Sequence, residues 1–116
     1  MNLKKIGLLI VTIIGLTACA NNAPKTQYDW GNYNLSLYSY FKEGDIAENI
    51  SLIEKDILKN EGSQKQIAPG VHAHLGLLYA KNGDTAKAYT EFETEKRLYP
   101  DSSHFMNYLL KNRGAR

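Results

Sequence analysis

Histidines are the first side chains in this 116-residue chain whose type suits metal chemistry. His72 and His74 stand two positions apart, and His104 lies in a later segment with no cluster of carboxylates beside it. On a helix, side chains at positions i and i+2 point to nearly opposite sides, so His72 and His74 cannot share one ion. We therefore expect no metal site, and histidines that are exposed or half-buried.

Acid–base and nucleophilic motifs are the second chemistry to consider. The sequence contains no nucleophile elbow, no Walker loop, no His-Glu-x-x-His and no paired-acid motif. Glu91, Glu93 and Glu95 alternate, and on a helix this spacing spreads them around the cylinder, which favours a solvated face. The sequence thus predicts no catalytic residue and no enzyme.

The only cysteine, Cys19, is the remaining reactive group. It follows Lys4, Lys5 and an apolar run at 6–16, a pattern that indicates a bacterial-type secretory signal. A membrane-spanning helix needs about 20 apolar residues, so an uncleaved anchor is disfavoured. A free reactive thiol is the other alternative, and the position directly after a signal argues against it.

The junction Leu16-Thr17-Ala18-Cys19 resembles the lipobox of bacterial lipoproteins: a branched apolar residue, two small residues and the cysteine. The resemblance implies that residues 1–18 are removed as a lipoprotein signal peptide. Cys19 would then carry diacylglycerol on its sulfur and a fatty acyl chain such as palmitate on its amino group. Three acyl chains anchor a protein stably to a membrane. This covalent lipid is the only cofactor that we expect.

Charge and the residues after the cysteine bear on location. Loss of Lys4 and Lys5 from the 14 basic residues leaves as many as the 12 acidic ones, and no basic run remains, so we expect no nucleic-acid binding. In enterobacterial lipoproteins an aspartate after the cysteine commonly marks inner-membrane retention. Ala20 therefore favours the periplasmic face of the outer membrane. Residues 19–27 are polar and aperiodic, which predicts a flexible tether.

The elements that must position any site lie in residues 28–116, for which one domain is expected. Turn signals such as Gly44-Asp45 and Asn82-Gly83 separate segments of helix length. Asp45 and Asp84 are placed to cap the helices that follow. The predicted fold class is all-α, with antiparallel helix hairpins and about five helices.

Residues 69–102 resemble a tetratricopeptide (TPR) repeat, a helix–turn–helix unit. Gly76 and Ala88 are small where its two helices should cross closely. Aligning Gly44 with Gly83 indicates a degenerate copy at 28–61. Residues 103–113 then predict a capping helix.

Two residues depart from the usual repeat, the first being His72, which stands where tryptophan is usual. Glu95 stands where the repeat usually has alanine, which implies a looser fit. Repeat stacks usually need about three units to bury a continuous core, and the sequence predicts only two helix hairpins and one further helix. We therefore expect this domain either to form a homo-oligomer or to dock on a larger partner.

In TPR stacks the first helix of each repeat lines a groove, and the resemblance assigns six residues to it. Such an apolar and aromatic groove usually holds a helix or extended segment. The other aromatic residues of 28–41 follow helical spacing and are expected mostly in the core, with Trp30 open between core and groove. The predicted partner-binding residues are Asn34, Tyr38, Phe41, Ala73, Leu77 and Ala80.

The stretch YDWGNYNLSLYSYFKEGD, together with the repeat that follows, resembles a family of small bacterial lipoproteins of unknown function. Its members are often encoded beside a CsgG-like (curli-assembly-like) lipoprotein. The resemblance implies a non-enzymatic, membrane-anchored adaptor in an envelope or secretion-related assembly, with a protein partner such as a CsgG-like lipoprotein. The alternatives are a pilotin-like escort of a secretin or pilus subunit, and a cell-wall enzyme or its inhibitor.

Overall fold

The computed structural model describes residues 2–5 and 27–113 of the chain. The secondary structure of these residues is mostly helical, with one pair of two-residue strands, so the all-α prediction is confirmed. The apolar run of the predicted signal peptide, Cys19 and the predicted tether up to residue 26 lie outside the described residues. No helix of the described part is both long and apolar enough to cross a membrane.

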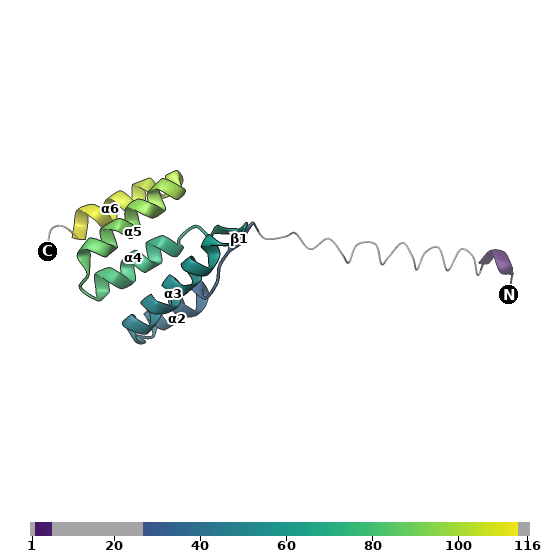
Figure 1. Ribbon diagram of the computed structural model, residues 1–116. Helices are drawn as coiled ribbons and strands as arrows, with labels where there is room; N and C mark the ends of the chain where they lie inside the picture. Colours follow the sequence, from purple (N-terminus) through teal and green to yellow (C-terminus); the bar gives the residue numbers. More distant parts are fainter. Residues whose placement is uncertain (1, 6–26, 114–116) are drawn as a thin grey trace.

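The main helices form two hairpins and a final single helix (Figure 1). In the first hairpin α2 packs on α3, in the second α4 packs on α5, and α6 packs on α5. The helices follow one another across the domain in chain order, with α2 and α3 at one end and α6 at the other. The elements are β1 (Tyr28–Asp29), α2 (Tyr33–Phe41), α3 (Ile46–Glu61), β2 (Gln66–Ile67), α4 (Val71–Lys81), α5 (Thr85–Leu98), the 3₁₀-helix η1 (Pro100–Ser102) and α6 (Ser103–Arg113).

In each hairpin one aspartate caps the start of the second helix, as the sequence predicts. The Asp45 carboxylate accepts a hydrogen bond from the backbone N–H of Glu48 at 2.8 Å. The Asp84 carboxylate accepts one from the backbone N–H of Lys87 at 3.1 Å. Each bond satisfies a backbone donor that a helix start leaves unpaired, which typically stabilises by about 1 kcal/mol. These caps fix the residues at which α3 and α5 begin.

The two hairpin turns differ in the residue that adopts a left-handed backbone. In the second turn this residue is Gly83, with φ of +87°. In the first turn it is Glu43, with φ of 56°, one residue before Gly44. A residue with a Cβ atom is disfavoured in this conformation by about 1–2 kcal/mol. The first turn therefore contains strain that the second avoids.

A short strand pair and one carboxylate fix the start of α2. β1 pairs in parallel with β2, which precedes α4. Asn32, a few residues after β1, is bound by Asp56 of α3. The Asp56 carboxylate accepts hydrogen bonds from the backbone N–H of Asn32 at 2.6 Å and from its side-chain amide at 3.0 and 3.1 Å. Gly31 passes so close that an added Cβ would lie 2.4 Å from Oδ2 of Asp56. The chain before α2 is thus held on α3.

The core lies between the two hairpins and extends to α6. Gly76 of α4 permits the closest approach, because an added Cβ would lie 2.5 Å from Cε1 of Phe92 and 3.2 Å from the carbonyl oxygen of Ala88. The close crossing that the sequence predicts for Gly76 and Ala88 is therefore confirmed. The buried apolar residues are Ile50, Ile53, Ala68, Val71, Leu75, Leu78, Tyr79, Ala88, Phe92 and Met106.

Candidate protein-binding face

The residues assigned to the partner-binding groove lie on α2 and α4, two helices in contact with each other. Those on α2 are more exposed than those on α4. On α2, Asn34 is exposed, and Tyr38 and Phe41 are 64% and 74% exposed. The three residues on α4 are half-buried and pack against the core. We call the six residues together the α2–α4 face: Asn34, Tyr38, Phe41, Ala73, Leu77 and Ala80.

A buried polar contact joins α2 to α4. The Oγ atom of Ser36 lies 2.9 Å from Nε2 of His74, and both side chains are buried. The rings of Tyr33 and Tyr40 meet the imidazole edge-on, with centroid separations of 5.5 and 5.8 Å. The expectation that each histidine is exposed or half-buried is wrong for His74, because the serine and the two rings give it a partnered, enclosed place.

The same burial sets the charge state of His74. Desolvation lowers the pKa of this imidazole. Its Nδ1 atom has no hydrogen-bond partner among the described residues. A protonated ring would place a charge and a second N–H donor in a site that offers no acceptor for it. His74 therefore holds α2 against α4 as a neutral ring.

Lysines lie at the C-terminal ends of both helices of the face. Nζ of Lys42 lies 5.8 Å from the ring centroid of Tyr38. Nζ of Lys81, the last residue of α4, lies 4.7 Å from the ring centroid of Tyr40 on α2. Both lysines are exposed, and neither helix sequence contains aspartate or glutamate. The face thus combines apolar and aromatic groups with positive charge.

The aromatic residues around α2 divide between the core and the surface. Tyr33 and Tyr40 pack on the core as expected. Trp30, however, is 43% exposed and lies against the ring of Tyr33 with centroids 5.7 Å apart. Since α2 begins only at Tyr33, Trp30 precedes the helix and does not follow its buried side. Phe41, at the other end of α2, also lies outside the core.

The position of Glu95 contradicts two predictions, that it lies on a solvated face and that it makes the fit between helices looser. It is 2% exposed, and its carboxylate accepts hydrogen bonds from the backbone N–H groups of Gly70 at 2.7 Å and Ala73 at 3.3 Å. These donors are at the start of α4, so a side chain of α5 caps the neighbouring helix. Its spacing from Ala88 and Phe92 puts Glu95 on the buried stripe of α5, a sequence signal that could have identified it.

A second polar cluster lies where α3, α4 and α5 meet. Nδ1 of His72 is 2.6 Å from Oε2 of Glu91, so Glu91 also departs from the predicted solvated face. The Tyr79 hydroxyl donates to Glu54, and burial, followed by this carboxylate, raises the pKa of Tyr79. The carboxylates and the imidazole of this cluster border a hollow of about 330 Å³, lined by Glu54, Ile57, Leu58, His72, Leu75 and Glu91.

The two neighbouring histidines thus contact different helices, as their spacing predicts. Within residues 2–5 and 27–113, no group of three or more histidine, cysteine, aspartate or glutamate side chains could hold a metal ion.

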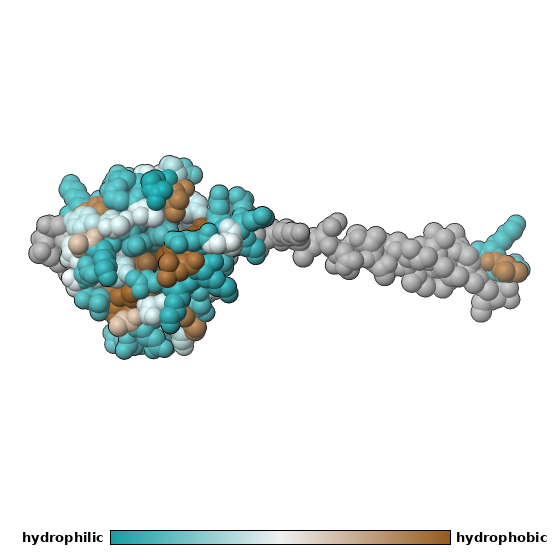
Figure 2. All heavy atoms as spheres, in the orientation of Figure 1, coloured by the Kyte–Doolittle hydropathy of each residue, from teal (hydrophilic) through white to brown (hydrophobic). Residues whose placement is uncertain are grey.

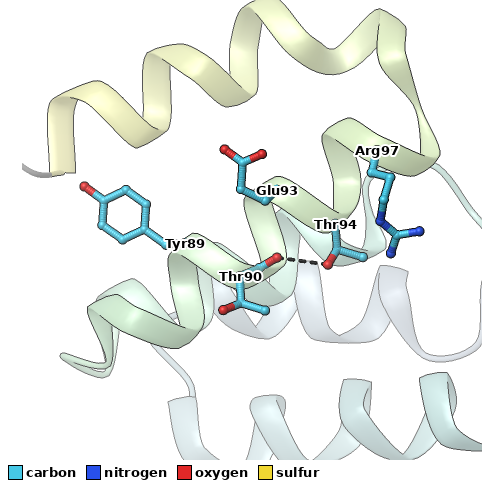
Figure 3. A pocket seen from close by; sticks show the side chains of 5 residues that line it. All are labelled: Tyr89, Thr90, Glu93, Thr94 and Arg97. Carbon is cyan, nitrogen blue, oxygen red and sulfur yellow. Dashed lines mark hydrogen bonds between the residues drawn. The ribbon is translucent and has the colours of Figure 1, made fainter.

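Another hollow, of about 490 Å³, lies along α5 (Figure 3). Two of its hydroxyl groups are engaged within the protein: the Tyr89 hydroxyl donates to the carbonyl of Leu110 in α6 at 3.0 Å, and the Thr94 hydroxyl donates to the carbonyl of Thr90 at 2.9 Å. These contacts hold α5 to itself and to α6. The lining residues are Tyr89, Thr90, Glu93, Thr94 and Arg97.

Exposed apolar side chains gather around α2. Figure 2 shows brown, hydrophobic areas set within a largely hydrophilic surface on the side that it presents. Four of the large exposed side chains belong to α2 or to the segment just before it. The large apolar residues exposed in residues 27–113 are Trp30, Leu35, Tyr38, Phe41, Leu58, Leu98, Phe105 and Tyr108.

The fold and the site together define a small all-α protein of two helix hairpins and a final helix, with apolar side chains exposed on α2. The chain belongs to the family described as Domain of unknown function (DUF4810), whose model matches residues 27–109. The match extends from just before β1 into α6. The comparison with curated proteins found no match, and neither did the comparison with solved structures.

Proposed function

We propose that this protein is a lipid-anchored periplasmic adaptor that binds another envelope protein through its α2–α4 face. The exposure of Tyr38 and Phe41 beside the half-buried apolar residues of α4 is the observation that carries the proposal. Large aromatic side chains left uncovered on a small domain commonly mark interaction sites and contribute much of the binding energy. The role is non-enzymatic, and it requires no cofactor besides the covalent lipid.

The anchor in this proposal is Cys19, in the outer membrane with the domain on the periplasmic side. The lipobox supports it. The tether of residues 19–27 spans at most about 30 Å when extended. Such a tether keeps the domain near the bilayer, where binding to another anchored protein gains from a high effective concentration. A membrane-attached partner such as a CsgG-like lipoprotein suits this arrangement.

A TPR-like organisation supports the choice of face. The alignment that places Gly44 on Gly83 also places Tyr38 on Leu77 and Phe41 on Ala80. The same side of the first helix in each hairpin therefore supplies the face. Repeated helices that present equivalent positions side by side form the extended binding surfaces of helical repeat proteins.

Two sets of variants test the anchor and the face separately. Cys19→Ser should move the protein from the membrane fraction to the soluble fraction. The double variant Tyr38→Ala/Phe41→Ala should stay in the membrane fraction but lose a co-purifying envelope protein. Leu58→Ala, which removes a side chain 65% exposed on α3, is the matched control and should retain that protein.

The anchor and the face would be contradicted by different results. Membrane attachment of the Cys19→Ser chain would exclude lipidation as the anchor. Undiminished co-purification with the Tyr38→Ala/Phe41→Ala variant, whose helical circular dichroism is unchanged, would exclude the face.

A further inference from the structure

The lysines beside the α2–α4 face occupy equivalent places in the two hairpins. The alignment that relates the hairpins places Lys42 on Lys81. Each places its ammonium group over a tyrosine ring of α2, at 5.8 and 4.7 Å. Such ring contacts keep the aliphatic stem on the apolar surface and the charge at its edge. Both positive charges are therefore held at one end of the face.

The carboxylates nearest in sequence to these lysines lie in the turns. Asp45 and Asp84 accept backbone N–H groups at the starts of α3 and α5, and Glu43 is exposed in the first turn. Within residues 27–113 neither Lys42 nor Lys81 forms an ion pair, whereas Lys87 and Lys96 on α5 pair with carboxylates at 3.8 and 2.9 Å. Lys42 and Lys81 therefore present positive charge beside the apolar residues of the α2–α4 face, whereas the exposed Lys55 and Lys59, which form no ion pair among the described residues either, lie on α3.

We propose that the polypeptide segment bound on the α2–α4 face is an apolar stretch with carboxylates at one end. The inference rests on the proposed function and specifies the chemistry of that partner. Apolar side chains of the segment cover Tyr38, Phe41 and Leu77, and its carboxylates pair with Lys42 and Lys81. Charge complementarity of this kind determines orientation and partner choice more than total affinity.

A peptide selection tests this chemistry while the partner itself is unidentified. The lipidated full chain, held in phosphatidylcholine nanodiscs, is used to select from a phage library of random peptides of about 12 residues, long enough for about three helical turns. The selected sequences should be enriched in aspartate or glutamate beside leucine, isoleucine or phenylalanine. Their affinity should fall about tenfold for Lys42→Glu/Lys81→Glu, and less for Lys42→Gln/Lys81→Gln.

The matched control is Lys55→Glu/Lys59→Glu, which reverses two exposed lysines of α3 and should leave peptide affinity unchanged. Circular dichroism of each variant verifies that the helices are intact. Equal loss of affinity in the α3 variant would show a general charge effect and overturn the proposal.

The remaining outcomes separate this inference from the proposed function. Selected peptides that lack acidic residues, tolerate charge reversal, yet require Tyr38 and Phe41, would overturn the acidic partner and leave the adaptor role standing. A selection that yields no peptide would overturn both. If, in addition, the Cys19→Ser chain sedimented with phosphatidylglycerol vesicles only while Lys42 and Lys81 were present, the face would belong to a lipid surface instead.

Discussion

At the residue scale, Glu95 has two partners that no other described side chain replaces. Glu95→Ala would leave the N–H groups of Gly70 and Ala73 without their carboxylate in a buried site. We expect a loss of about 1–3 kcal/mol in the free energy of unfolding, measured by urea titration. Glu93→Ala, on the same helix but exposed, should change it by less than about 0.5 kcal/mol. Equal effects of the two variants would contradict the capping role.

His74 gives the fold a pH dependence with a definite sign. Because burial lowers the pKa of His74, there is a pH range below the unfolded pKa in which the imidazole is protonated in the unfolded chain and neutral in the folded chain. The contribution of His74 is thus complete above the unfolded value of about 6.5 and is lost as the pH falls below it, down to the native pKa. Urea unfolding between pH 7.5 and 5.5 should show stability falling by up to about 1.4 kcal/mol per pH unit.

Two variants assign that slope to its residue. His74→Gln should flatten the dependence on pH, although it also lowers stability at pH 7.5 by disturbing the contact with Ser36. His104→Gln, at an exposed position, should leave the slope as it is. A slope that survives in the His74 variant would show that another group controls it.

At the element scale, the two turns offer a reciprocal test of backbone strain. Glu43→Gly should raise the free energy of unfolding by about 0.5–1 kcal/mol, because glycine adopts its φ of 56° without a Cβ clash. Gly83→Ala should lower it by about 1 kcal/mol. No described atom lies within 4 Å of the added Cβ at Gly83, so the effect there isolates the backbone. Thermal melting measures both, and shifts of the same sign would contradict this account.

The helices themselves were predictable because their signals are local. Asp45 and Asp84 cap helices that begin at the next residue, through N–H groups only three residues ahead, and the breaker Asn82-Gly83 lies directly between two helices. The close approach at Gly76 was also readable, since one repeat contains both of its helices. Signals of this range lie within a single sequence window.

Contacts between distant elements were not predictable in the same way. Ser36 and His74 lie on different hairpins, and Glu95 lies one helix beyond Gly70. Nothing in the local pattern around His74 indicates that a serine and two tyrosine rings enclose it. The position of Trp30 depended likewise on where α2 begins, and Asp56 of α3 fixes that point by binding Asn32.

At the scale of the whole molecule, the proposed function assigns attachment and recognition to different parts of the chain. We propose that a lipidated Cys19 and its tether attach the protein to the membrane, and that the α2–α4 face binds a partner. Among the described residues, large apolar side chains are also exposed on α3 and α6, at Leu58, Phe105 and Tyr108. Exposure of an apolar side chain is therefore not sufficient to mark the site. The proposed function requires that the partner binds at α2 and not at these other residues.

Photo-cross-linking in intact cells tests this central claim most directly. A photoreactive amino acid replaces Phe41 in one strain and Leu58 in another, with the native Cys19 present in both. The account predicts a discrete adduct with another envelope protein from position 41 and none from position 58. The same adduct from both positions, or none from position 41 while the protein remains at the membrane, would contradict it.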